Sequence, residues 1–320
     1  MPELFDALPG QEVPVGGISA GFKKIWADTP AEESRAVQLN LVLHLGRNSS
    51  AADALVQFQN TLNFARRYPC RVVVLCPDYE ASSPPEMRAK IYGECFFGKA
   101  KNDTRCVEFV ILHYTMSARQ HLENQVSVCL STDLPLYYWA HAFAETRRLA
   151  EYGYLLTRSQ RVLFDSAIVP PDTFTYPWPN LSAVRDLAYT RTLPLRQNLG
   201  QFLSRYTPAQ IIGGLQTIVL RHQASYAAEA GCLLGWVRKG LARGGSDPAT
   251  VVFTVKPEPC QGCFELSFGY ADPAKIFRWE ADLAKNHAQF TGDLGTGRTS
   301  LTVGASLLAP EMALAEAMFF

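Results

Sequence analysis

The sequence predicts an α/β fold in two parts, an N-terminal mixed-sheet, Rossmann-like domain followed by a C-terminal α+β domain. Through the first half, apolar blocks of strand length alternate with helical patterns, which is typical of α/β layering. Four prolines then fall within residues 170–179, and so dense a cluster cannot continue a helix or a central strand. We therefore expect an α/β domain over residues 1–169, a proline-rich linker over 170–179 and an α+β domain over 180–320.

The first half begins with a Pro/Gly-rich lead, after which residues 37–45 read as a buried strand. A helix follows from Ser50 to about Arg67, with Ser49 or Ser50 as a suitable N-cap, and its apolar side chains fall on one face. The next expected elements are a strand at 70–76, a hairpin of 88–97 with 106–114, a helix at 117–130, a strand at 134–140, a helix at 145–159 and a strand at 161–165. Together they predict a mixed sheet of about six strands covered by helices.

The second half mixes helices and strands without a regular alternation, which predicts an α+β arrangement. The expected elements are helices ending near Tyr189 and starting near Thr192, a strand at 211–220, a helix at 224–242, strands at 251–255, 264–269 and 300–303, and a helix from Pro310.

Composition excludes several classes of protein. The 320 residues are 48% hydrophobic and 19% charged, as in ordinary globular proteins, and 30 basic residues balance 30 acidic ones. Without a bulk positive field, we expect neither nucleic acid nor a membrane surface as a partner. Glu3 and Asp6 stand where a signal peptide carries basic residues. Most of the eight cysteines, including Cys106, lie in apolar runs as free core thiols do, so we expect a cytoplasmic location.

Three glycine-containing segments resemble known motifs but lack their context. Residues 17–21 match G-x-S-x-G without the preceding strand, so we expect a turn entering a short helix at Phe22. Residues 292–297 are expected to form a hairpin loop rather than a phosphate loop. The segment 46–50 lies at a predicted helix N-terminus, where backbone N–H groups can receive an anion, but it lacks the spaced glycines of a dinucleotide site.

Cys260 and Cys263 form a single C-x-x-C motif. Structural zinc needs further ligands at a suitable spacing, and thioredoxin-like chemistry needs the pair at the start of a helix. Two interpretations remain open. The pair consists of ordinary turn cysteines, or it is a dithiol in a hairpin loop that closes reversibly and makes the protein redox-regulated.

Polar residues gather where predicted strands end and just beyond the linker. His141 follows a predicted parallel strand, and ligands of open α/β sheets bind at such carboxyl ends. One interpretation of the charged residues is helix capping and interdomain salt bridges, and the other is an interdomain cleft whose arginines clamp a sugar phosphate or nucleotide. The interface or ligand candidates are Asp133, Trp139, His141, Asp165, Ser166, Asp186, Tyr189, Arg191 and Arg196. We expect no catalytic residue, metal or cofactor.

Five runs carry a family resemblance in a fixed order along residues 37–240. They are RYPCRVVVLC ending at Cys76, DLPLYYW at 133–139, RVLFDS at 161–166, DLAYTRTLPLRQNLGQF at 186–202 and AEAGCLLGWV at 228–237. Together they resemble OpcA, the glucose-6-phosphate dehydrogenase assembly proteins of cyanobacteria and actinobacteria. The resemblance implies a non-catalytic partner that assembles or activates that NADP-dependent enzyme of the oxidative pentose phosphate pathway. Surplus aromatic residues near the predicted junction suit an interface.

Three functions therefore stay open at this point. The protein is an allosteric activator that binds the dehydrogenase, a binding module with a sugar phosphate or nucleotide in the interdomain cleft, or an enzyme that acts on such a ligand.

Overall fold

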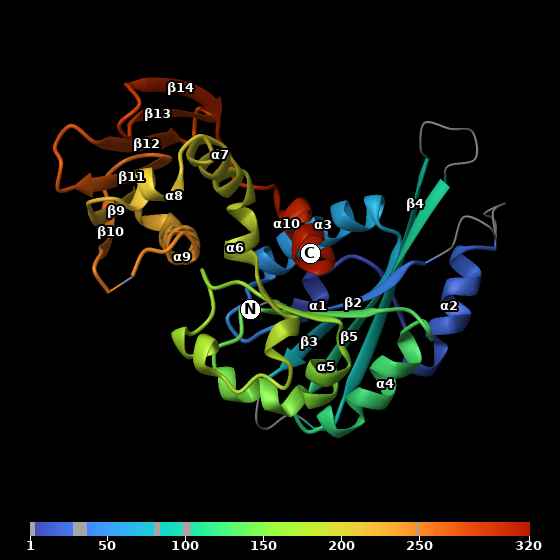
Figure 1. Ribbon diagram of the computed structural model, residues 1–320. Coiled ribbons are helices and arrows are strands. Elements are labelled where there is room, and N and C mark those ends of the chain that lie inside the picture. Colours follow the sequence, from blue (N-terminus) through green and yellow to red (C-terminus); the bar gives the residue numbers. More distant parts are fainter. Residues whose placement is uncertain (1–3, 28–36, 80–83, 98–103, 248) are drawn as a thin grey trace. The chain divides into compact units, whose positions relative to one another are not determined.

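The computed structural model describes residues 4–27, 37–79, 84–97, 104–247 and 249–320, and the chain forms two compact units (Figure 1). The first unit comprises Met1–Leu187 together with Pro310–Phe320, and the second comprises Ala188–Ala309. The predicted linker at 170–179 lies inside the first unit. Pro171–Thr175 form a 3-10 helix there, and the buried Trp178 donates from its indole Nε1 to the Thr173 carbonyl at 3.0 Å.

The first unit confirms the α/β class. In the described part of the chain its sheet has eight strands in the order β1-β4-β5-β3-β2-β6-β7-β8. Neighbouring strands from β5 to β8 pair in parallel, whereas β4 pairs antiparallel with β5, as the predicted hairpin requires, and with β1. The strands are β1 (Gln11–Val13), β2 (Leu39–Leu45), β3 (Cys70–Asp78), β4 (Met87–Phe97), β5 (Thr104–Thr115), β6 (Leu136–His141), β7 (Arg161–Phe164) and β8 (Val184–Asp186).

The order of the parallel strands reverses between β2 and β6. Numbered along the chain, the six parallel strands follow the order 3-2-1-4-5-6 of a doubly wound sheet, which supports the Rossmann-like prediction. In such sheets, ligands bind outside the carboxyl ends of the strands at the point of reversal. Here that point lies beside Leu45 and His141, which are register partners at the ends of β2 and β6.

Helices cover both faces of this sheet. Leu41 and Leu43 of β2 join the core under α1, α3 and α10, whereas Val42 joins the core under α2, α4 and α5, because successive strand side chains point to opposite faces. Figure 1 shows α10, in red, beside α3. The helices are α1 (Leu4–Ala7), α2 (Ile18–Ile25), α3 (Ala51–Arg67), α4 (Leu122–Cys129), α5 (Gly153–Arg158) and α10 (Pro310–Phe319). The predicted helices at 117–130 and 145–159 each begin instead with a 3-10 turn.

The second unit has a mixed sheet with helices α7 and α9 packed on its buried side. Among its described residues the strand order is β10-β9-β11-β12-β13-β14, with only β9 and β10 parallel. The strands are β9 (Leu215–Gln223), β10 (Val252–Glu258), β11 (Cys263–Tyr270), β12 (Ile276–Asp282), β13 (His287–Asp293) and β14 (Thr299–Gly304). The helices are α6 (Leu187–Arg191), α7 (Leu193–Leu203), α8 (Pro208–Ile212) and α9 (Ala227–Arg243).

Local sequence explains where the prediction was wrong in this unit. The expected strand at 211–220 starts only at Leu215, because Thr207 and Gln210 form a capping box that opens α8 and places Ile211 in a helix. The segment 292–297 joins β13 to β14, as expected of a hairpin loop. The C-terminal helix begins at Pro310 as predicted but belongs to the first unit.

Candidate functional site

The candidate site lies where β2 and β6 end in the first unit. Gly46 N–H donates to the carbonyl of His141 at 2.7 Å, and Asn48 N–H donates to that of Ala142 at 3.0 Å. A Cβ on Gly46 would lie 2.5 Å from the backbone N and Cα of Phe143, closer than real contacts allow. Glycine is therefore required here, and it fixes the β2–α3 loop against the end of β6.

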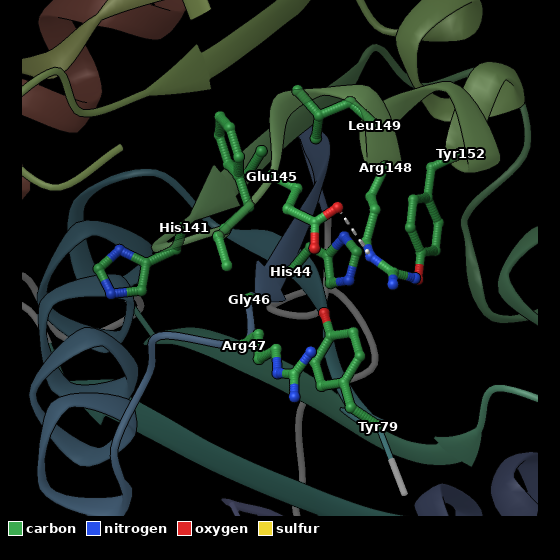
Figure 2. Close-up of a pocket in the computed structure, with 12 residues that line it drawn as sticks. His44, Gly46, Arg47, Tyr79, His141, Glu145, Arg148, Leu149 and Tyr152 are labelled. Atoms are coloured by element: carbon green, nitrogen blue, oxygen red, sulfur yellow. Dashed lines mark ion pairs between the residues drawn. The ribbon is translucent and has the colours of Figure 1, made fainter. Parts of the chain in front are cut away.

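Charged and aromatic side chains surround a small cavity of about 20 Å³ at this point (Figure 2). Arg47 comes from the β2–α3 loop, and its guanidinium lies 5.8 Å from the ring centroid of Tyr79, just after β3. Glu145 and Arg148 follow β6 and form an ion pair at 3.7 Å. A wider cavity of about 510 Å³ shares Gly46, Arg47 and Tyr79 and reaches Ser49 and Ser50 at the start of α3.

A buried hydrogen-bonded chain reaches the cavity through His44 and Tyr152. Nδ1 of His44 lies 2.7 Å from the Tyr138 hydroxyl, and its Nε2 lies 3.3 Å from that of Tyr114, which in turn is 2.7 Å from the hydroxyl of Tyr152. Burial lowers the pKa of His44 to about 3 and raises those of Tyr114 and Tyr138 well above their usual value. The chain is thus neutral at physiological pH and acts as hydrogen-bonded scaffolding.

His141, the predicted residue at the end of β6, pairs with α3. Its Nε2 lies 2.7 Å from Oδ2 of Asp53, which is in the first turn of that helix. Partial burial acts to raise the pKa of Asp53, but hydrogen bonds from His141 and Gln57 outweigh it and lower that pKa. The resulting carboxylate is well placed near the positive end of the helix dipole. In Figure 2 the His141 ring points away from Arg148, so its side chain orders the site from behind.

The other predicted residues of the first unit do not form one cluster. Ser166 donates from its backbone N–H and its hydroxyl to Asp186, at 3.0 and 2.7 Å, and this joins the carboxyl ends of β7 and β8. The carboxylate of Asp165 accepts from the N–H of Ala167 in the same turn. Asp133 is exposed in the loop before β6, at the opposite edge of the sheet, and Trp139 is only 3% exposed in the core.

The predicted residues of the second unit pair among themselves. Arg191 donates from Nε and Nη2 to Oε1 of Glu229 at 2.9 and 2.7 Å, and Glu229 is only 4% exposed. The Arg196 guanidinium lies 3.9 Å from the ring centroid of Tyr189 and donates to its hydroxyl at 2.9 Å. These contacts lie within the second unit, so the interdomain salt bridges stay a prediction. The interdomain cleft stays a prediction.

Sequence reasoning did not single out His44, Tyr79, Glu145, Arg148 or Tyr152. Their signal was positional, because each lies at or just after the carboxyl end of a parallel strand, or in the segment that follows β6. In the described part of the chain, no group of three or more His, Cys, Asp or Glu side chains is arranged to hold a metal ion. Nor do the described helices include one with the length and apolar character needed to span a membrane.

Cysteine pairing differs from the sequence expectation. Cys95 and Cys106 stand opposite each other in the β4–β5 ladder and form a disulfide, so Cys106 is not the free core thiol that we predicted. Cys260 and Cys263 also form a disulfide. Their loop is not a hairpin, because β10 and β11 pair with opposite edges of β9 and the loop crosses the end of that strand. The cytoplasmic location and the redox role stay predictions.

Comparison with known proteins finds similarity to one family over part of the first unit. Residues 62–182, from α3 to the last turn before β8, match a family described as glucose-6-phosphate dehydrogenase subunit N-terminal domain, of the OpcA type. These residues are similar to that family's domain. A Synechocystis sp. protein named as an OxPP cycle protein OpcA is 26% identical over 187 residues, which is 54% of this chain. The alignment covers 37% of that relative's length, and the resemblance to OpcA is confirmed.

Proposed function

We propose that this protein is a non-catalytic assembly factor and allosteric activator of glucose-6-phosphate dehydrogenase in the oxidative pentose phosphate pathway. The OpcA match over residues 62–182 carries the proposal. The polar side chains at the carboxyl ends of β2 and β6 are hydrogen-bonded or ion-paired to neighbouring side chains, which supports a non-catalytic role. His44 is bonded to tyrosines, His141 to Asp53 and Arg148 to Glu145, as in an ordered surface rather than a poised acid or base.

Activation requires that the protein bind the active form of the dehydrogenase more tightly than the inactive form. A tenfold shift of that equilibrium needs about 1.4 kcal/mol of differential binding free energy. The test mixes the purified protein with its cognate dehydrogenase and measures KM, Vmax and oligomeric mass. We expect activation in the mixture and no turnover by the protein alone. Turnover by the protein alone, or an unchanged enzyme in the mixture, would contradict the proposal.

A second candidate function is the binding of a sugar phosphate or nucleotide at the carboxyl ends of β2 and β6. The observation that favours it is the reversal of strand order between β2 and β6, which places the cavity of about 510 Å³ where doubly wound sheets bind ligands. Arg47 supplies positive charge there, and the N-terminus of α3 supplies backbone N–H groups. Calorimetry with glucose 6-phosphate and with NADP tests it. Arg47→Ala should abolish binding of the ligand. Arg158→Ala, near the amino ends of the strands, is the control and should leave binding unchanged.

We also propose that the Cys260–Cys263 disulfide makes activation redox-dependent. The pair lies in a loop beside a cavity of about 580 Å³, and Gly262 of that loop donates to the Gln223 side chain at the end of β9. Opening the disulfide would free the loop without disturbing the core.

A further inference from the structure

The second unit carries an apolar groove between α7 and α9, with a volume of about 260 Å³. We propose that this α7–α9 groove docks an acidic segment of the dehydrogenase, which inserts one large apolar side chain. This proposal rests on the proposed function, because it identifies the surface that would bind the dehydrogenase. The walls and floor include Leu203, Ile211, Ile212, Trp236, Val237 and Phe268.

The size and lining of the groove suit a side chain better than a metabolite. Cavities that hold drug-sized ligands usually span about 300–1,000 Å³ and present a few converging polar groups. This groove is smaller, and its walls are almost entirely carbon. Large apolar side chains that enter such pockets supply much of the binding energy at protein interfaces.

Glycines keep the groove open. Gly200 of α7 and Gly240 of α9 both line it. A Cβ on Gly240 would meet no heavy atom within 4 Å, and a Cβ on Gly200 would approach only Trp236, at 3.9 Å. Glycine weakens a helix interior relative to alanine, and neither position has the positive φ that would require it. Packing within the unit therefore does not account for these glycines, whereas an inserted side chain would.

Basic residues around the groove select an acidic partner. Lys239 precedes Gly240, Arg243 precedes Gly244, and Arg205 lies between the lining residues Ser204 and Tyr206. All three are exposed, and within the described residues none of them has a carboxylate at ion-pair distance. Within α9 the one acidic residue, Glu229, is already paired with Arg191. The uncompensated charge attracts and orients an acidic segment.

The first test fills the groove without harming the helix. Gly240→Leu places a side chain in the groove, and Gly231→Leu is the matched control, because Gly231 lies on the same helix, has no heavy atom within 4 Å of its would-be Cβ and does not line the groove. Both changes favour helix, so both variants should keep their melting temperature. We expect Gly240→Leu to weaken binding of the cognate dehydrogenase at least tenfold in interferometry, and Gly231→Leu to leave it unchanged.

The second test reverses the charge. Lys239→Glu combined with Arg243→Glu should weaken binding at least tenfold and flatten its dependence on salt, whereas Arg298→Glu on the β13–β14 loop should do neither. If the parent binds the dehydrogenase and Gly240→Leu binds equally well, the groove is not the docking surface and the proposed function stands. If charge reversal has no effect, the occupant is not acidic and the inference is wrong. If the parent does not bind, both proposals fail.

Discussion

Arg191 and Glu229 form a nearly buried ion pair that links α6 to α9. Arg191→Ala would leave the Glu229 carboxylate buried without its partner, and such a loss costs about 3 to 5 kcal/mol of unfolding free energy. Arg196→Ala removes partly exposed contacts, with the ring of Tyr189 and the hydroxyl of Thr192 among them, and should cost less, about 1 kcal/mol. Urea denaturation measures both. An unchanged unfolding free energy for Arg191→Ala, with activation lost, would instead assign Arg191 to a partner or ligand.

His44 makes the stability of the first unit depend on pH. Its folded pKa of about 3 lies below the ordinary value of 6.5, because burial disfavours the charged ring. The unfolded chain therefore takes up a proton at a higher pH than the folded protein does. Above pH 6.5 His44 does not lower the unfolding free energy, because the ring is neutral in both states. As the pH falls from 6.5 toward 3, the unfolding free energy decreases by no more than about 1.4 kcal/mol per pH unit.

Denaturation at a series of pH values tests the role of His44. His44→Gln should be less stable than the parent at pH 7, because it loses hydrogen bonds to Tyr138 and Tyr114. Between pH 6.5 and 4, however, its stability should fall less steeply than that of the parent. All other groups are the same in the two proteins, so their contributions cancel in the comparison. Equal slopes would show that His44 titrates alike in the folded and unfolded states.

At the scale of elements, the β4–β5 hairpin is held by a cross-strand disulfide. Cys95 and Cys106 are separated by 11 residues, and closing a loop of that length removes about 2 to 3 kcal/mol of chain entropy from the unfolded state. The double variant Cys95→Ser/Cys106→Ser should lose about this much stability under oxidising conditions. In reductant, the parent should fall to the level of the variant. A parent that is equally stable with and without reductant would contradict the role.

The Cys260–Cys263 loop should respond to redox conditions without unfolding. Cys70 and Cys76 are buried free thiols whose pKa is raised by burial, so they should resist alkylation while Cys260 and Cys263 gain label on reduction. Mass spectrometry measures the labelling, and the dehydrogenase assay measures the consequence. Cys260→Ser should abolish the response of activation to oxidant, whereas Cys232→Ser should keep it. If the Cys260→Ser protein responds to oxidant as the parent does, the two cysteines have no redox role and are ordinary turn residues.

The sequence predicted strands well where they are continuous apolar runs, and less well where polar residues alternate with the apolar ones. The parallel strands of the first unit are buried on both faces and read as continuous apolar runs. β12 and β13 alternate buried with exposed residues and were missed, because Arg278 and Glu280 interrupt the apolar signal between Phe277, Trp279 and Ala281. The sequence placed His141 correctly at the carboxyl end of its strand. Its pairing with Asp53, 88 residues away, depends on tertiary packing, which no local pattern contains.

At the scale of the molecule, α10 completes the core of the first unit. Leu314 is buried, and Phe319 lies 4.8 Å from the ring centroid of Tyr68. Leu314→Ala should cost about 2 to 5 kcal/mol, whereas Leu181→Ala, at an exposed position, should change little. Hydrogen exchange should then speed up in β2 and β3 while β9 and β11 keep their protection. Equal loss of protection in both sheets would show that the units unfold as one.

The return of α10 to the first unit also sets an order of events during synthesis. Residues 188–309 of the second unit are contiguous, so this unit can complete its core before α10 has emerged from the ribosome. The first unit, although its strands emerge earlier, lacks Leu314, Ala317 and Met318 until the last helix leaves the exit tunnel. Its apolar surface over α3 thus stays uncovered until α10 packs on it. That interval is when a chaperone, or the dehydrogenase itself, would first meet this face.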